Sequence, residues 1–197
     1  YHFDHAFYKG KYYMYFGVVP AVFVFVPYRL LTGKSLTSYR ATQPFTILFI
    51  IGVFLLFKKL AELFFNDISC TLYALLSSAF SFMSIWYVTA TPALYCIPII
   101  SGICFEVWSL YFFFKAVYDD ISENKAIAFA FLGSLAGALT FGCRPPIALA
   151  NILVLPLLIQ FLKKRKLNAG LFFKLVIAAL PYVIIGILLM LYNYQKI

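Results

Sequence analysis

The sequence is poor in charge. Only 12% of its 197 residues are Asp, Glu, Lys or Arg, and only seven of these are acidic. A soluble domain needs about twice this share of charged residues to cover its surface. Hydrophobic residues make up 64% of the chain, and its mean hydropathy is +0.93. The composition therefore excludes a soluble domain and indicates a polytopic membrane protein with an all-α fold.

Cysteine and histidine are scarce as well. The chain has two His, and its four Cys form no C-x-x-C pair and have no His at metal-ligand spacing. All four lie within or at the ends of apolar runs, so we interpret them as small buried hydrophobic residues and predict no metal or redox centre. They are Cys70, Cys96, Cys104 and Cys143.

The sequence also lacks an initiating Met and a secretory signal pattern. It begins at Tyr1 and stops in YNYQKI directly after an apolar run. We therefore expect a fragment of a longer chain, in which residues 193–197 begin a further external segment.

The shortage of acidic residues leaves a net charge of +9. The basic residues occupy separate short loops and do not follow one face of a helix. This distribution reports membrane topology and contact with anionic lipid, and we expect no nucleic-acid partner.

Six apolar segments are long enough to cross a bilayer, which requires about 17 to 25 residues. They are 41–57, 68–88, 95–115, 126–142, 147–162 and 171–192. The segments 126–142 and 147–162 are separated by Arg144-Pro145-Pro146, which interrupts the apolar stretch from Ala126 to Leu162. Because Pro breaks a helix and Arg is costly at mid-membrane, the sequence predicts a tight hairpin with Arg144 at an interface.

Basic residues fall at every second turn of the predicted bundle. The positive-inside rule places these turns in the cytoplasm, and the short turns 89–94 and 144–146 then lie outside, together with 32–40 and the C-terminal run. The nine basic residues of the cytoplasmic turns are Lys58, Lys59, Lys115, Lys125, Lys163, Lys164, Arg165, Lys166 and Lys174. The acidic YDDISENK turn is predicted to be solvated cytoplasmic surface without a chemical role.

The segment 14–31 decides on which side residues 1–13 lie. A crossing would place Lys9 and Lys11 in the cytoplasm, which the positive-inside rule favours. Pro20, Pro27 and Arg29 weaken the segment as a span, and its Tyr-rich entry is typical of interfacial helices. The residues alone leave both arrangements open.

Three motifs near this segment carry a family resemblance. They are the aromatic entry GKYYMYFGVVP at 10–20, the closing Leu-Thr-Gly at 31–33, and Arg40, seven residues beyond that Gly. Further stretches that fit are the Lys58-Lys59 turn, TATPALY at 89–95 and LTFGCRP at 139–145. The pattern resembles GT-C glycosyltransferases of the aminoarabinose-transferase and protein-mannosyltransferase type. It is also similar to uncharacterised multi-pass proteins of Gram-positive anaerobes.

The resemblance implies a bacterial cytoplasmic-membrane enzyme that takes a sugar from a polyprenyl-phosphate donor on the external face. Residues 1–40 would be the end of an external loop with an in-plane juxtamembrane helix, and 41–192 the helix bundle. The family's catalytic acidic pair would precede Tyr1, so Asp4 is expected at most as a second acidic group of the site. The family often uses a divalent cation, but the sequence gives no ligand set for one.

Phosphate binding at the outer surface requires cationic groups. Arg144 and Arg40 stand at the outer ends of spans, and Lys9 and Lys11 flank Gly10 among tyrosines. These four residues are the candidate binding set. The alternatives are snorkelling for the two Arg and anchoring in the aromatic belt for the Lys-Tyr run.

Glu106 is the one acidic residue inside a predicted span. An intramembrane carboxyl is a functional candidate, either facing a substrate cavity, pairing with a basic residue or carrying a proton in a transporter. A transporter or flippase of lipid-linked saccharides is therefore the alternative to the enzyme, and a non-catalytic membrane protein is a third possibility. Gly133-x-x-x-Gly137 predicts close helix packing.

Overall fold

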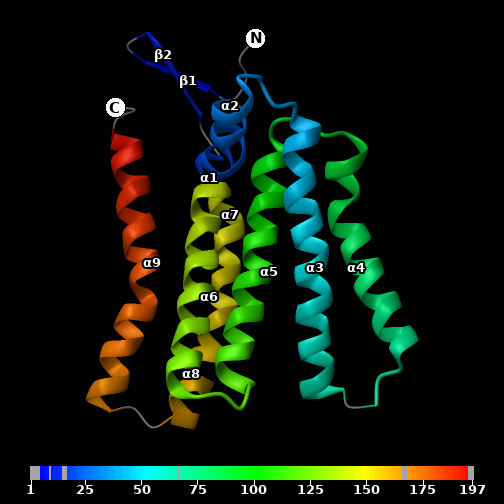
Figure 1. Ribbon diagram of the computed structural model, residues 1–197, viewed down its shortest axis with the longest axis vertical. Helices are drawn as coiled ribbons and strands as arrows, with labels where there is room; N and C mark the ends of the chain where they lie inside the picture. Colours follow the sequence, from blue (N-terminus) through cyan, green and yellow to red (C-terminus); the bar gives the residue numbers. More distant parts are fainter. Residues whose placement is uncertain (1–4, 9, 15–16, 66, 166–167, 195–197) are drawn as a thin grey trace.

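The computed structural model describes residues 5–8, 10–14, 17–65, 67–165 and 168–194. Long helices run side by side and antiparallel along one axis, and short elements gather at one end of the bundle (Figure 1). The long helices are α3 (Ser38–Phe64), α4 (Cys70–Ala90), α5 (Cys96–Tyr118), α6 (Glu123–Cys143), α8 (Val154–Arg165) and α9 (Ala169–Tyr194). The prediction of an all-α, polytopic bundle is confirmed.

Five of the six predicted spans form helices that are long and apolar enough to cross a membrane. These are α4, α5, α6, α9 and the continuous run Pro145–Arg165. The remaining prediction, 41–57, falls within the 27-residue helix α3, which lies beside α4 and α5 without being among those five (Figure 1).

The run Pro145–Arg165 is not one regular helix. It consists of α7 (Pro145–Ala148), the 3-10 helix η2 (Leu149–Leu153) and α8. The predicted break before it is confirmed: α6 ends at Cys143, Arg144 is extended with φ −154° and ψ 109°, and the two prolines occupy the first turn of α7. Proline suits that position because the first helical N–H groups have no partner within the helix.

The two ends of the bundle differ in what they carry. At one end, which also carries the β-hairpin, α3 and α5 begin and α6 and α9 finish (Figure 1). We call it the hairpin end. At the other end α3, α5 and α8 finish and α4, α6 and α9 begin, and we call it the lysine end after the basic residues there, which include Lys59, Lys115 and Lys174. The hairpin itself pairs β1 (His5–Tyr8) with β2 (Lys11–Met14) in antiparallel register, with Tyr8 opposite Lys11. This hairpin is the one departure from an all-α fold in the described part of the chain.

A short helical segment follows the hairpin. It comprises α1 (Val18–Pro20), the π-helical turn η1 (Ala21–Phe25) and α2 (Val26–Thr32). At about 1.5 Å per residue its 15 residues reach about 22 Å, less than the ~30 Å hydrocarbon core. Both the hairpin before it and the start of α3 after it lie at the hairpin end (Figure 1). The segment therefore does not run the length of the bundle, and its placement in the plane of the membrane stays a prediction.

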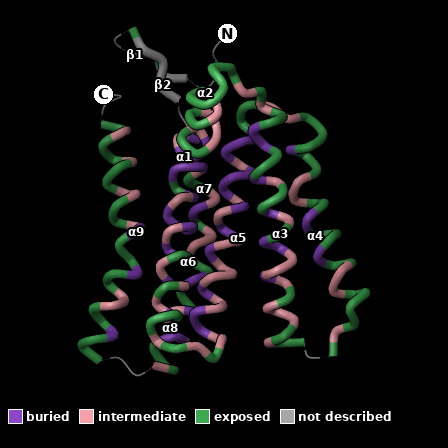
Figure 2. The backbone as a smooth tube through the Cα atoms, in the orientation of Figure 1, coloured by how far each residue is buried: buried purple, intermediate pink, exposed green. Residues whose placement is uncertain are grey.

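Helix α5 is the centre of the bundle. It packs against α1, α3, α4, α6, α7, η2 and α8. In the stretch of α5 that is long enough to cross a membrane, over half of the residues are buried. The corresponding share in α9 is 11%, and its outer surface is exposed (Figure 2). Exposed apolar side chains on outer helices are what a lipid-facing surface requires.

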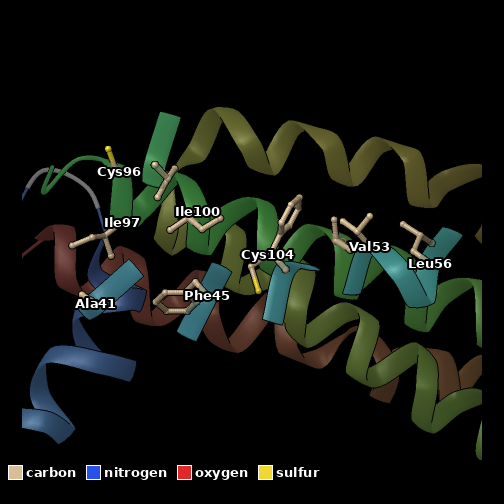
Figure 3. Close-up of a cluster of buried hydrophobic side chains, with 11 residues drawn as sticks. Ala41, Phe45, Val53, Leu56, Cys96, Ile97, Ile100 and Cys104 are labelled. Atoms are coloured by element: carbon tan, nitrogen blue, oxygen red, sulfur yellow. The ribbon is translucent and has the colours of Figure 1, made fainter. Parts of the chain in front are cut away.

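Two apolar clusters flank α5. The first joins α3, α4 and α5 and includes Phe45, Val53, Ile100 and Cys104 (Figure 3). The second joins α5, α6, α8 and α9 around Phe113, Leu157, Phe161 and Leu171. The four cysteines are free. Cys96, Cys104 and Cys143 are buried as predicted, but the prediction is wrong for Cys70, which is exposed at the first position of α4.

The topology gives a labelling prediction. In a background free of native Cys, Ala6→Cys and Ser35→Cys should both react with an impermeant thiol reagent in intact cells, because both positions belong to the hairpin end. Asp120→Cys and Lys163→Cys at the lysine end should react only after permeabilisation. Opposite behaviour of residues 6 and 35 would show that the segment crosses.

Candidate functional site

The α1 turn docks on the hairpin end of the bundle through small contacts. Gly17 has φ +81°, and a Cβ there would approach Pro98 Cγ of α5 to 2.8 Å. Val19 is 6% exposed, and its side chain occupies the space over Gly142 of α6. Glycine is needed at 17 because the left-handed backbone and the close approach both exclude a side chain. This docking fixes the α1 turn next to the start of α5 and the end of α6.

Arg40 and Arg144 lie at this same end. Arg40 is exposed in the first turn of α3, where the Thr37 hydroxyl caps the helix by accepting the Arg40 N–H at 3.4 Å. Arg144 is half-buried in the turn between α6 and α7. Figure 1 shows α3 and α6 on opposite sides of α5, so the two Arg share an end without being neighbours.

The other predicted binding residues come from the hairpin. Lys11 is the first residue of β2, at the hairpin end. Asp4 and Lys9 lie outside the described residues, so their predicted roles stay predictions.

The hairpin end carries no carboxylate among the described residues. Its described basic residues are Lys11, Arg29, Lys34, Arg40 and Arg144. Five of the chain's seven acidic residues are at the lysine end: Glu62, Asp67, Asp119, Asp120 and Glu123. The hairpin end therefore has the charge that an anionic group requires.

Glu106 is buried in the middle of α5. It is 6% exposed, and within the described part of the chain neither carboxyl oxygen has a hydrogen-bond partner. Almost every other buried polar group in a protein finds such a partner, so an unpaired carboxyl calls for an explanation. Glu106 thus lies inside the predicted membrane-length helix and is buried there, while its role stays a prediction.

A polar cluster surrounds the place where α5, α6, η2 and α9 meet. The Tyr182 hydroxyl donates to Asn151 Oδ1 at 2.6 Å, and Asn151 Nδ2 donates to Thr140 Oγ1 at 3.0 Å. Ser109 Oγ donates to the Gly133 carbonyl at 2.9 Å. Glu106 precedes Ser109 by one turn of α5. We call Glu106, Ser109, Thr140, Asn151 and Tyr182 the polar cluster.

Gly137 makes this cluster geometrically possible. A Cβ at Gly137 would overlap the Tyr182 hydroxyl and Asn151 Oδ1 and would lie 3.0 Å from Ser109 Oγ. One turn earlier, Phe113 packs directly over Gly133. The predicted small-residue face of α6 is thus confirmed, and it accommodates both close helix packing and converging polar atoms.

The sequence predicted Glu106 but missed the rest of the polar cluster. Ser, Thr and Tyr are common in membrane helices, and nothing in their spacing shows that they meet. Asn151 was the usable signal, because an amide within the apolar run 147–162 needs partners. Its side chain also bonds the Ala148 carbonyl at 3.0 Å, in the same stretch where the helix tightens into η2.

A cavity of about 380 Å³ lies beside the polar cluster, between α6, α8 and α9. Asn151, Tyr182 and Ser134 form its polar wall. The remaining lining is apolar and extends to Leu162 and Leu175, near the lysine end. The cavity thus reaches from the neighbourhood of one end of the bundle to its middle.

The turn between α5 and α6 ties the lysine end together. Asp119 pairs with Lys59 of α3 at 2.5 Å and with Lys115 at 3.8 Å, and Glu123 pairs with Lys174 of α9 at 2.5 Å. From α8, Lys164 and Arg165 each donate to a backbone carbonyl, of Val117 and Ile121. The sequence predicted solvated surface here. This prediction is wrong, because carboxylates and carbonyls in and beside the turn bind basic side chains of three other helices, α3, α8 and α9.

Within the described residues, no three His, Cys, Asp or Glu side chains gather to hold a metal ion. Comparison of the chain with protein-family models, with curated proteins and with solved structures finds no match.

The role of Gly137 can be tested by adding one methyl group. Gly137→Ala should lower the stability of the folded protein by about 1–3 kcal/mol, the usual cost of overpacking. The measurement is the thermal midpoint of the detergent-solubilised protein.

Gly186→Ala on α9 is the matched control, because nothing lies within 4 Å of a Cβ at that position. Alanine favours a helix over glycine by about 1 kcal/mol, so this variant should be neutral or stabilising. Equal midpoints for the two variants would contradict the packing assigned to Gly137.

The ion pairs at the lysine end give a second stability prediction. Asp119→Asn should lower the free energy of unfolding by about 1 kcal/mol, since Asp119 is one-fifth exposed and faces two Lys. The same change at its exposed neighbour, Asp120→Asn, should leave the midpoint unchanged. High salt should narrow the difference between the two variants; a difference that salt leaves intact would argue against an ionic origin.

Proposed function

We propose that this chain is part of a GT-C type membrane glycosyltransferase. It would transfer a sugar from a polyprenyl-phosphate donor to an acceptor at the hairpin end, on the external face of a bacterial cytoplasmic membrane. The observation that supports this most is that Arg40, Arg144 and the docked α1–α2 segment belong to the same end of the bundle, where the described residues include no carboxylate.

The charge at this end suits a lipid phosphate. When a polyprenyl phosphate leaves the sugar, negative charge develops at the bilayer surface and must be stabilised by fixed cations. A guanidinium offers a planar fork of donors that binds phosphate through two bonds. Arg144 stands on the extended turn between α6 and α7, where such a headgroup would arrive.

The α1–α2 segment suits the same task. Val19 and Pro20 bury one side of it against the bundle, while Leu30 and Leu31 are 80% and 86% exposed. A helix with one side on the protein and an exposed apolar side is what the membrane interface accepts. It would hold the hairpin and Lys11 at the level of lipid headgroups.

Sugar transfer also needs a carboxylate to accept the proton of the attacking group. Within this chain Asp4 is the acidic residue that the sequence places near the hairpin end. The resemblance assigns the main catalytic carboxylates to a part of the family that precedes the hairpin.

A second candidate function is transport of a lipid-linked saccharide. The observation that favours it is Glu106, a buried carboxyl without a hydrogen-bond partner among the described residues, in a bundle that also holds a cavity lined by Asn151 and Tyr182. Intramembrane carboxyls of this kind occur in transporters, where they face a substrate or ion path.

The enzyme proposal is tested at Arg144. In the full-length protein, Arg144→Ala should lower the rate of sugar transfer about tenfold to a hundredfold, by loss of a charge-assisted contact to the leaving phosphate. Arg144→Lys should recover only part of the rate, because Lys lacks the fork. The measurement is transfer of radiolabelled sugar from polyprenyl phosphate in membrane vesicles.

Lys163→Ala is the control, since it removes one exposed positive charge at the opposite end. It should leave transfer unchanged. Equal rates for wild type, Arg144→Ala and Lys163→Ala, at equal amounts of inserted protein, would refute the phosphate-binding role and leave Arg144 as an interfacial anchor.

A further inference from the structure

Glu106 lies deep within α5, well inside both Cys96 at the start and Tyr118 at the end of the helix. With 6% of its surface exposed and no hydrogen-bond partner for either oxygen among the described residues, it is a buried acid without a visible counterpart. Leaving a bare carboxylate at such a depth is strongly unfavourable. Some positively charged species must therefore compensate it.

The described part of the chain supplies no such charge at this depth. The basic side chains of α5, α6, α8 and α9 stand at the lysine end: Lys115, Lys125, Lys163, Lys164, Arg165 and Lys174. Arg144 belongs to the turn at the other end. From the neighbouring helices, the titratable groups near Glu106 are the Tyr182 hydroxyl and, beside Gly102, the thiol of Cys143. Neither carries a positive charge.

The polar groups next to Glu106 along α5 are oxygens, because Ser109 follows it by one helical turn. The hydroxyls of Ser109, Thr140 and Tyr182 and the amide of Asn151 converge from α5, α6, α9 and η2. Hydroxyl, amide and carboxylate oxygens are the ligands that hard cations prefer. Asn151 moreover sits in a 3-10 stretch, and interrupted membrane helices are a recurrent feature of sites for Na⁺ and H⁺.

The cavity offers a route to the Asn151 and Tyr182 side of the polar cluster. It starts near the lysine end at Leu162 and Leu175 and ends at Asn151 and Tyr182, which belong to the polar cluster. Its volume of about 380 Å³ accommodates several waters, and Ser134, Asn151 and Tyr182 give them polar partners. A small cation entering from the lysine end would therefore meet the polar cluster before it met the hairpin end.

We propose that Glu106 and the polar cluster form a binding site for one monovalent cation, a proton or Na⁺, which is reached from the lysine end through the cavity between α6, α8 and α9. The site is distinct from the phosphate-binding end. The inference does not rest on the proposed function, because occupancy of Glu106 can be measured without sugar transfer.

The test uses the full-length protein in detergent with dicyclohexylcarbodiimide. This apolar reagent forms a stable N-acylurea with a protonated carboxyl in an apolar environment and fails with one that is ion-paired. The adduct is located by mass spectrometry of the peptide that contains Glu106, in choline chloride and in sodium chloride. We expect an adduct on Glu106 in choline chloride.

The two salts distinguish the cations. Equal labelling in both identifies the proton as the ligand, and labelling about tenfold slower in sodium chloride identifies Na⁺, by competition at the carboxyl. Absence of an adduct on Glu106 in both salts would overturn the proposal, because the carboxyl would then already be compensated by a group of the protein.

Variants identify the carboxyl that carries the adduct. Glu106→Gln should abolish the adduct, and Glu123, which pairs with Lys174, should not be labelled in the wild type. Tyr182→Phe should change the labelling rate of Glu106 severalfold, while Tyr194→Phe on the exposed end of the same helix should not. Labelling of Glu123 at the rate of Glu106, or identical rates in the two Tyr variants, would overturn the site as described.

Discussion

The close approach of α5 to α6 is the interaction on which the rest of the bundle depends. The ring of Phe113 packs against Gly133, and the missing side chain of Gly137 leaves room for atoms from α5, η2 and α9. In lipid, helices gain little from hydrophobic burial against one another, so backbone proximity and interhelical hydrogen bonds must hold them together. Ser109 provides such a bond to the Gly133 carbonyl. Glu106 is buried because the two helices meet this closely, and α5 becomes the shared wall of both apolar clusters.

The charges of the chain are sorted around this core. Carboxylates and lysines meet at one end, where Asp119 and Glu123 bind α3 and α9. At the other end the described residues are cationic without opposing carboxylates. One end therefore pairs charges of both signs, whereas the described residues of the other end carry charge of one sign, which suits an anionic group. This difference is a physical reason to assign structural work to the first end and recognition to the second.

Most of the fold was predictable because lipid restricts what a chain can do. An apolar run of membrane length must be a helix, and Arg144-Pro145-Pro146 must be a break. The hairpin at His5–Met14 was not predicted, since its aromatic residues fit an interfacial segment equally well. The role of Asp119 was missed because a charged turn between spans looks solvated until its neighbours are placed. Likewise, Thr140 and Tyr182 are more than forty residues apart, and only helix packing brings them to the same amide of Asn151.

Helix α9 is held differently from the other helices. It packs mainly on α6, and its polar ties to other helices include Tyr182 in the middle and Lys174 near its start. An element with few buried contacts opens at lower free-energy cost than the core. Movement of α9 would therefore behave as a separate cooperative unit and would pivot about the Lys174 anchor while α5 and α6 stay in place. The width of the cavity beside Asn151 would then depend on the position of α9 alone. Small local movements of this helix would set how long a water molecule stays in the cavity.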